Sequence, residues 1–517
     1  MDKDNKNMLL GVAIGSVSVG LMSILGTRKL PGSKKEICTI VKRAVQQRNQ
    51  ITKRILVCGS GMMTPSLVSY LMRNDHYSIT IASNIINDAR AIAGKYPGRA
   101  DACFLDVGDE EQTINLVKDY DIVISYIPPF LHPKIFKACS LAKIHLVTAS
   151  YLTDDMLKYD KECKKDGVIF LNECGLDPGI DIMSTMKIKD EIEAEGGKIT
   201  KYESWCGGLP CAEDSDNPLS YKFSWEPRAV FSTSKNSATF LKDGKVVKVE
   251  AEDLMKGGTR PKNYSSALNL EGYPNRDSSV FKKAFNFKDA KTFIRGTLRY
   301  GGFSIIMRAL HQIGITNADF EIDHQKIKTM RDLTKSLVED VTPKVDDFTL
   351  EFENSYISDK KDQELISCLL QKVPDRENYV KIINSWKFFE LFNGERKIKE
   401  EWKTALDALS AISLEKMSYA EGERDLIIMK HIFEIETSEG KKKLLHSTMI
   451  ASGDRIGSSG FSAMAKTVGF TTAIGVNLIL EGKIKARGVL SPKTPEFYEQ
   501  MLPILEEDGI KVSEKYL

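Results

Sequence analysis

Short hydrophobic runs recur along residues 55–172, and polar amphipathic stretches separate them. The runs lie at residues 55–58, 77–83, 102–107, 121–126, 145–149 and 168–172. Apolar and β-branched runs of this length predict strands, and the stretches between them, such as 110–118, predict helices. Strands that alternate with helices are typical of an α/β fold with a parallel sheet, which binds ligands at the carboxyl ends of its strands. The residues expected at these ends are Gly59, Ser83, Asp106, Ser125, Thr148 and Asn172.

The first run leads directly into a glycine turn. The sequence ILVC is followed by Gly59, Ser60 and Gly61 and then, apart from Pro65, by a segment without helix breakers. This order predicts a corner whose backbone N–H groups bind a pyrophosphate. Thr64 stands where the third glycine of G-x-G-x-x-G is usual, so the motif alone also fits an ordinary strand–turn–helix corner. The surrounding strands favour a dinucleotide-binding domain.

The pattern changes after the predicted sheet. Residues 198–304 are rich in Gly, Pro, Asn and aromatic residues, with short strands such as 245–250, and predict an α/β substrate domain with long loops. Helical spacing of apolar residues predicts a helical subdomain between 316 and 420. Residues 425–436 and 443–450 predict an antiparallel strand pair, and 461–481 a long buried helix that closes the chain.

These patterns give a division of the chain into domains. The expected parts are 1–50, an N-terminal apolar segment with a basic linker; 51–178, the dinucleotide-binding domain; 179–315 with 421–455, the substrate domain; 316–420, the helical subdomain; and 456–517, C-terminal helices that return to the nucleotide domain.

Composition narrows the class of function. The 517 residues are enough for two or three domains with their own cores. A net charge of +2, with basic and acidic residues intermixed, gives no reason to expect nucleic acid as a partner. Nine cysteines without CxxC pairs indicate a reducing compartment. Seven histidines without ligand spacing predict no metal site.

The N-terminus is unusually apolar. Residues 9–26 carry no charge and are followed by lysines and arginines; their length is at the lower limit for a membrane span. Gly11 and Gly15 have the GxxxG spacing of packed transmembrane helices. Three interpretations stay open: a single-span or interfacial anchor, a cleaved secretory signal, and a mitochondrial presequence, which Asp2 and Asp4 disfavour. The basic flank of an anchor would place the rest of the chain on the cytosolic or matrix side.

Polar loops follow the predicted strand ends. Residues 172–181, NECGLDPGID, form a sharp turn that we expect to place Asp177 toward the nicotinamide end of a cofactor. The sequence TASY at 148–151 offers three hydroxyl groups. Arg299, in GTLRYGG at 296–302, stands among small residues and can clamp a carboxylate. Each loop alone can be a structural turn, but together they predict a small polar acid as substrate.

With these motifs the sequence resembles the glutamate-forming saccharopine dehydrogenase family, also called saccharopine reductases, which belongs to lysine metabolism. The motifs that carry the resemblance, in order over about residues 54–512, are ILVCGSG, LDV, TASY, GLDPGID, CGGLP, DNPLSYKFSW, LEGYPNRDS, GTLRY and FSAMAKTVG. The resemblance implies a Rossmann-type parallel-sheet nucleotide domain, a second α/β domain and a helical insertion. It also implies NAD(P)-dependent oxidation of saccharopine to glutamate and aminoadipate semialdehyde, or the reverse reaction.

The resemblance also assigns residues. Asp177, Cys206 and Tyr151 are the catalytic candidates, with Asp177 favoured as the orienting or proton-handling group. Ser150, Tyr151 and Arg299 are the candidates for substrate binding. The residues that match family cofactor contacts are Gly59, Ser60, Gly61, Met62, Met63, Ser83, Asn84, Asp106, Val107, Ile127, Thr148, Leu176 and Asp177.

The chain departs from the family pattern at several positions. Neutral Asn84 stands where an Asp selects NAD and an Arg selects NADP, so the cofactor is NADP or NAD, with a slight preference for NADP. Glu226 replaces a usual serine and opposes an anionic ligand unless Arg228 pairs with it. Ile182 replaces a frequent histidine, and Pro129 replaces an aromatic residue.

Two hypotheses of different classes follow. The first is an active saccharopine dehydrogenase. The second, motivated by residues 9–26 and Glu226, is a membrane-anchored relative with weakened activity that serves as an accessory or scaffold subunit of a complex. The retained GTLRY and LEGYPNRDS motifs argue against a third option, a relative with another substrate.

Partners and location follow from the same features. We expect an amino-acid substrate, no nucleic acid, membrane or membrane-complex contact through residues 9–26, and a homo-oligomer or a subunit of a complex. The expected location is a reducing compartment, either the mitochondrial membrane or matrix or the cytoplasm, with the N-terminus as a membrane anchor.

Overall fold

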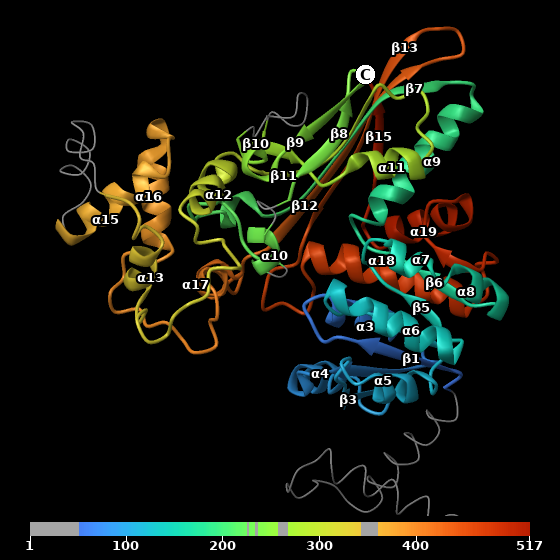
Figure 1. The fold of residues 1–517 in the computed structure, drawn as a ribbon. Helices are drawn as coiled ribbons and strands as arrows, with labels where there is room; N and C mark the ends of the chain where they lie inside the picture. Colours follow the sequence, from blue (N-terminus) through green and yellow to red (C-terminus); the bar gives the residue numbers. More distant parts are fainter. Residues whose placement is uncertain (1–50, 225–226, 233–235, 257–266, 343–359) are drawn as a thin grey trace, which may run out of the picture. The chain divides into compact units, whose positions relative to one another are not determined.

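The computed structural model describes residues 51–224, 227–232, 236–256, 267–342 and 360–517 (Figure 1). The chain forms two compact units, one made of the residues up to Ser60 with Leu71–His145 and the other of Gly61–Tyr70 with Leu146–Leu517. Residues 9–26 and Glu226 lie outside the described residues, so the expectations attached to them stay predictions. The domain boundaries expected from the sequence also stay a prediction.

The first unit contains four parallel strands in the order β4-β1-β2-β3. The strands are β1 (Lys53–Cys58), β2 (Tyr77–Ser83), β3 (Ala100–Phe104) and β4 (Ile122–Ser125). Their helices are α4 (Ile86–Ala93), α5 (Glu110–Val117), the short η1 (Pro129–Leu131) and α6 (His132–Ala142). The four apolar residues of the first predicted run, 55–58, are fully buried, which confirms the central strand of the α/β fold.

Strand β3 differs from its prediction. It was expected at 102–107 but spans Ala100–Phe104. The backbone N–H of Gly108 donates to Asp106 Oδ1 at 2.7 Å, and such a side-chain turn ends a strand early. Asp106 and Val107 therefore lie in the loop after β3.

The second unit carries a further parallel group in the order β14-β6-β5. The strands are β5 (His145–Val147), β6 (Ile169–Leu171) and β14 (Gly488–Leu490). The nearby helices in the chain are α3 (Thr64–Leu71), α7 (Asp154–Leu157), α8 (Asp160–Asp166) and α9 (Ile180–Ala194). β14 was not expected from the sequence, because it has only two apolar residues besides a glycine, Val489 and Leu490.

A second sheet of eight strands forms the centre of this unit (Figure 1). Its order is β15-β13-β12-β7-β11-β8-β9, and β10 pairs with β11. The strands are β7 (Lys198–Pro210), β8 (Ala238–Lys242), β9 (Lys245–Val249), β10 (Leu270–Pro274), β11 (Thr292–Tyr300), β12 (Asp425–Glu436), β13 (Lys442–Ser452) and β15 (Ser513–Tyr516). β7 and β11 run parallel, and β12 pairs antiparallel with both β7 and β13. The predicted strand pair is thus confirmed, as is the second α/β domain.

The described residues of the stretch expected to be helical, 316–420, contain several helices. They are α13 (Met330–Ser336), α15 (Lys360–Gln371), η5 (Arg376–Asn378), α16 (Tyr379–Phe388) and α17 (Ala405–Met417), and α12 (Phe303–Gln312) precedes the stretch. Smaller helices between the strands of the second sheet are η2 (Ala212–Asp214), α10 (Pro227–Ser232), η4 (Ala251–Asp253) and α11 (Ser278–Ala284). Thr329 and Thr404 each begin a helix with a capping box, which satisfies N–H groups that the helix leaves unpaired. Trp386 is fully buried in their apolar core.

The C-terminal part is more varied than predicted. Helix α18 (Ala463–Leu480) is long and apolar enough to cross a membrane, but 72% of it is buried inside the protein, as expected of a core helix. The expectation that it closes the chain is wrong, because α19 (Pro495–Glu507) and β15 follow it. β15 is a fully exposed edge strand, and such a strand lacks the buried alternation that predicts one.

Substitution of Trp386, the largest side chain in the helical core, tests how much this core contributes to the free energy of unfolding. We expect Trp386→Ala to lower the free energy of unfolding by about 3–5 kcal/mol, since it leaves a cavity in a close-packed region. Val380→Ala on the same helix is the control, because Val380 is 39% exposed. Urea unfolding followed by circular dichroism measures both; equal effects would contradict a core centred on Trp386.

Candidate active site

One face of the second sheet is charged although it is buried. Strand pairing aligns Arg295 with Ser204 and Thr297 with Cys206, so Arg295, Arg299 and Cys206 lie on one face by the alternation of strand residues. The opposite face carries the apolar cluster that includes Trp205 and Leu298. Arg295 is 4% exposed and Arg299 6%. Buried arginines require partners, and those of Arg295 come from the loop after β6 and from the first turn of α9.

That loop makes the sharp turn predicted for GLDPGID. The N–H of Gly175 donates to Pro178 O at 3.1 Å. Gly179 has φ +147°, and a Cβ there would lie 2.0 Å from Gly175 O, so only glycine fits. The N–H of Gly179 donates to Asp181 Oδ1 at 2.7 Å. The turn thereby fixes Asp177 and Asp181 on either side of the start of α9.

Both carboxylates share one arginine. Arg295 donates from the same terminal nitrogen to Asp177 Oδ1 at 2.5 Å and to Asp181 Oδ2 at 2.6 Å. Its guanidinium lies 3.9 Å from the ring centre of Phe281, a cation–π contact. Tyr151 donates its hydroxyl to Asp177 Oδ1 at 3.1 Å. The side chain of Asp177 is 17% exposed and that of Asp181 only 1%, so Asp177 is the carboxylate that a ligand can reach.

The protonation states of Asp181, Tyr151 and Cys206 follow from their burial and from the excess of negative charge, since two carboxylates share one guanidinium. Burial, and next the charge of Asp177, raise the pKa of Asp181 to about 7, although Arg295 opposes this. Burial and Asp177 also raise the pKa of the Tyr151 hydroxyl well above its usual value. The pKa of the Cys206 thiol rises well above its usual value for the same two reasons. Tyr151 is therefore a proton donor, and Cys206 is a thiol that is poorly suited to act as a nucleophile.

Arg299 lies in a different setting from the one expected. It donates to Leu298 O at 2.7 Å, and its guanidinium lies 4.9 Å from the ring centre of Tyr221 and 5.2 Å from that of Phe303. The setting is thus aromatic rather than one of small residues. Within the described residues no carboxylate pairs with Arg299. Ser150 binds within the chain, since its N–H donates to Thr148 Oγ1 at 3.2 Å and its carbonyl accepts from Glu173 N.

Sequence reasoning missed Arg295, Asp181 and His431. His431 Nε2 lies 3.0 Å from Ser184 Oγ, and Ser184 donates its own proton to Ile180 O. His431 is therefore protonated on Nε2, and burial lowers its pKa to about 3, so it stays neutral beside Arg295. The available signal for Arg295 was its spacing from Arg299, since residues four apart in a strand share a face.

The predicted cofactor residues of the first unit lie at the carboxyl ends of its strands. They are Gly59 and Ser60 after β1, Ser83 and Asn84 at the end of β2, Asp106 and Val107 after β3, and Ile127 after β4. Ser60 donates to Ser83 Oγ at 2.8 Å, which brings two of these ends together. Gly59 has φ +114°, and a Cβ there would clash with Tyr126 O at 2.4 Å, so the glycine is required.

The remaining cofactor residues belong to the second unit. They are Gly61, Met62 and Met63 before α3, Thr148 after β5, and Leu176 and Asp177 after β6. Cys174 N donates to Thr148 O at 3.1 Å and joins the two loops. A Cβ on Gly61 would meet no heavy atom within 4 Å, so this face of the turn is open for a ligand to approach.

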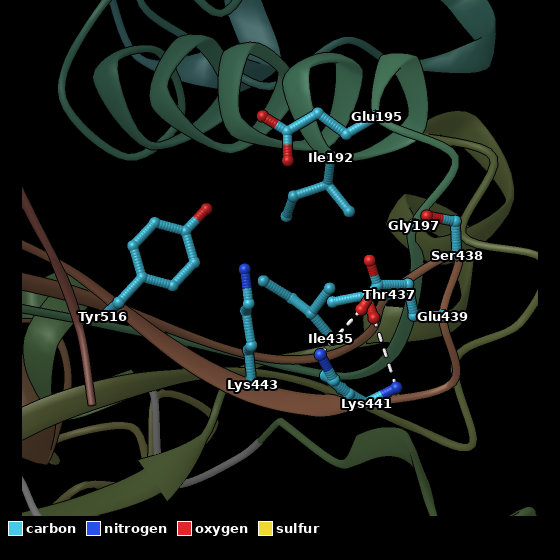
Figure 2. A pocket seen from close by; sticks show the side chains of 10 residues that line it. All are labelled: Ile192, Glu195, Gly197, Ile435, Thr437, Ser438, Glu439, Lys441, Lys443 and Tyr516. Carbon is cyan, nitrogen blue, oxygen red and sulfur yellow. Dashed lines mark hydrogen bonds and ion pairs between the residues drawn. The ribbon is translucent and has the colours of Figure 1, made fainter.

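A surface pocket of about 230 Å³ lies elsewhere, at the turn between β12 and β13 (Figure 2). Glu195, Lys443 and Tyr516 are among its lining residues. None of the predicted site residues lines it, and it is smaller than the roughly 300–1,000 Å³ of most ligand pockets. It has no part in the site built from Arg295.

The parallel strands and the glycine turn define an α/β protein of the dinucleotide-binding class. Residues 55–171 match the model described as "Saccharopine dehydrogenase NADP binding domain", and residues 175–510 match "Saccharopine dehydrogenase C-terminal domain". The chain belongs to the saccharopine dehydrogenase family.

Similar proteins agree with this assignment. Saccharopine dehydrogenase [NADP(+), L-glutamate-forming] of Saccharomyces cerevisiae is 36% identical over 90% of this chain and 99% of its own. Mitochondrial alpha-aminoadipic semialdehyde synthase of Bos taurus is 34% identical over 89% of this chain but only 47% of its own. The apo structure of the L-Glu-forming yeast saccharopine dehydrogenase has a TM-score of 0.77 and 35% identity, and the match covers 90% of this chain and 100% of that one.

Removal of the shared cation should destabilise the protein. Arg295→Gln leaves two buried carboxylates without a counter-charge, and we expect it to lower the free energy of unfolding by about 3–5 kcal/mol. The double variant with Asp181→Asn should recover part of the loss, because it removes one of the two charges. Arg424→Gln, in an exposed pair with Glu213, should have no measurable effect. Full additivity of Arg295→Gln and Asp181→Asn in urea unfolding would contradict the shared contact.

The raised pKa of Asp181 predicts a pH dependence of stability. Between about pH 4 and pH 7 the folded protein keeps a proton that the unfolded chain releases, so stability falls as the pH rises. Relative to Asp181→Asn, the wild type should therefore be less stable at pH 8 than at pH 5, by about 1.4 kcal/mol for each pH unit between pH 5 and the raised pKa. Asp332→Asn is the control, because the pKa of Asp332 is lowered and its effect should not change in this range. A pH-independent difference for Asp181→Asn in urea unfolding would contradict the assignment.

Proposed function

We propose that the protein is an NADP-dependent saccharopine dehydrogenase of the glutamate-forming type. It oxidises saccharopine at the secondary amine and hydrolyses the imine to glutamate and aminoadipate semialdehyde, or runs the reverse reaction. The observation that carries the proposal is Arg295 held between Asp177 and Asp181 on a buried face that also presents Arg299. The relatives named above support the substrate and the cofactor.

The glycine turn fits a dinucleotide. The open face of Gly61 lets a pyrophosphate approach the turn that leads into α3. Ser60, Ser83 and Asn84 are the residues we assign to the adenosine end, and Leu176 and Asp177 to the nicotinamide end. A dinucleotide held by these residues would supply the hydride acceptor for the carbon next to the amine of the substrate.

The two arginines bind different anionic groups: Arg299 binds the substrate, and Arg295 binds aspartates of the protein. Arg299, which the described carboxylates leave unpaired, holds a substrate carboxylate, and the rings of Tyr221 and Phe303 keep its guanidinium in place. Ser150 and Tyr151 bind another polar end of the substrate. Arg295 is already neutralised, so its task is to hold Asp177 in position.

We assign proton transfer to Asp177, the more exposed of the two aspartates that bind Arg295. The oxidised amine loses its N–H proton, and hydrolysis of the imine returns protons to nitrogen as the C–N bond breaks. We assign the first proton to Asp177, whose carboxylate is reachable, with Tyr151 as the hydrogen-bond donor that orients it. Cys206, as a neutral thiol, lines the site and forms no covalent bond with the substrate.

Two of the positions discussed among the departures from the family pattern have a clear structural setting. Ile182 is fully buried, so its side chain belongs to the core. Arg228 pairs with Asp407. The features that motivated an accessory or scaffold role, Glu226 and residues 9–26, lie outside the described residues, and no other observation favours that role.

The cellular compartment follows from the cysteines and from the N-terminal segment. The cysteines of the described part are all free, which fits a reducing compartment, either mitochondrial or cytoplasmic. The anchor proposed for residues 9–26 predicts that alkaline carbonate leaves the full-length protein in the membrane fraction. Release into the soluble fraction would contradict a spanning anchor.

A spectrophotometric assay tests the function. Purified full-length protein with saccharopine should reduce NADP⁺, and glutamate should appear in equal amount. Folded protein that shows no turnover with either NADP⁺ or NAD⁺ would contradict the proposal.

Asn84 should set the choice of cofactor. It is exposed directly after β2, where a charge meets the ribose 2′ position. We expect Asn84→Asp to lower kcat/KM for NADP⁺ about tenfold or more, equivalent to about 1.4 kcal/mol, and to spare NAD⁺. Asn84→Arg should do the opposite. Asn115→Asp, an exposed site on α5, is the control, and an unchanged NADP⁺/NAD⁺ ratio in both Asn84 variants would refute the role.

A further inference from the structure

Helix α18 contacts α3, the helix that follows the glycine turn. Residues Gly61–Tyr70, which contain nearly all of α3, belong to the second unit together with α18. Ser66 donates its hydroxyl to Ala465 O at 2.6 Å. A Cβ on Gly469 would lie 2.2 Å from Ser66 Oγ and 2.9 Å from the backbone N of Leu67. The two helices therefore approach so closely that only the small Ser66 side chain lies between them at this point.

Small residues make this approach possible. Ala465 and Gly469 are four apart, so they lie on one face of α18. Gly469 is needed for space, because any side chain there would displace the backbone of α3. One turn further along, the rings of Tyr70 and Phe470 pack with their centres 4.9 Å apart. The contact thus runs along α3 and fixes its distance from α18.

Ser66 connects this contact to the start of α3. Its hydroxyl, which is fully buried, lies 2.9 Å from Met63 O as well as near Ala465 O. Met63 belongs to the segment between the glycine turn and the helix, and Thr64 N donates to Gly61 O at 3.0 Å. A shift of Ser66 would therefore move Met63 and the start of α3, next to the glycine turn.

We propose that Gly469 and Ser66 are positioning residues for the dinucleotide, through which α18 sets the place of α3. The inference rests on the proposed function only in that a dinucleotide binds at the glycine turn; it needs no particular substrate. α18 belongs to the segment that matches the C-terminal domain, so this domain affects cofactor affinity also through a helix that holds none of the assigned cofactor contacts. The motif FSAMAKTVG, which the substrate site leaves unexplained, gains a function.

Direct binding of NADPH to the full-length protein, followed by the fluorescence of the bound nucleotide, tests the proposal. Gly469→Ala should raise the dissociation constant about tenfold or more, since small misplacements of binding groups cost this much. KM for NADP⁺ should rise in parallel, while kcat and KM for saccharopine stay within about twofold, because the substrate residues do not move. Gly197→Ala is the control for crowding: a Cβ there would lie 2.9 Å from Ile192 Cγ2, far along the chain from α3, and the dissociation constant should not change.

A second variant covers the case in which Gly469→Ala does not fold. Ser66→Ala adds no atoms and removes the hydroxyl near Met63 and Ala465, so it should also weaken NADPH binding several-fold. Wild-type affinity in the folded Ser66 and Gly469 variants, or an equal loss in Gly197→Ala, would overturn the proposal. If the wild type binds NADPH but does not oxidise saccharopine, the proposed function fails and this inference stands.

Discussion

The contact of Arg295 with Asp177 and Asp181 is the constraint on which the candidate site depends. One cation compensates two carboxylates on a face from which water is largely excluded. Such a cluster is costly to bury, and it persists only where the backbone leaves the groups no alternative. The difference in exposure between the two carboxylates then separates a group that can act on a ligand from one that holds the arginine.

Two features of the backbone bring Arg295 and the two aspartates together. Alternation along β11 directs Arg295 and Arg299 to the same face and leaves Leu298 to the apolar side. The turn closed by Gly179 brings the start of α9 to that face, so Asp181 arrives from a helix and Asp177 from a loop. The charged site and the apolar core are therefore two sides of one sheet.

The sequence allowed prediction of local features whose signal is periodic. The buried run of β1, the register pair β12 and β13, and the core helix α18 all have such signals, and the structure contains each of them. The predicted cofactor residues lie at strand ends because a parallel sheet places them there. β14 and β15 were missed because β14 has only two apolar residues besides a glycine and β15 is polar and exposed, so pairing with neighbours in space defines both.

The missed site residues have a different cause. Asp181 and Arg295 are far apart in the sequence, and nothing local to either shows that they meet. Asp177 was predicted because it follows a strand and precedes a proline, whereas its partner depends on how β11 pairs with β7. Likewise, the aromatic setting of Arg299 comes from Tyr221 and Phe303, which no spacing connects to it.

A crystal structure with both NADP⁺ and saccharopine bound is the most direct test of the central claim. The account predicts that the secondary amine lies within about 2.6–3.2 Å of Asp177 or Tyr151, that a substrate carboxylate pairs with Arg299, and that Arg295 keeps both of its aspartates. Saccharopine bound away from Asp177, or a substrate carboxylate that displaces Asp181 from Arg295, would contradict it.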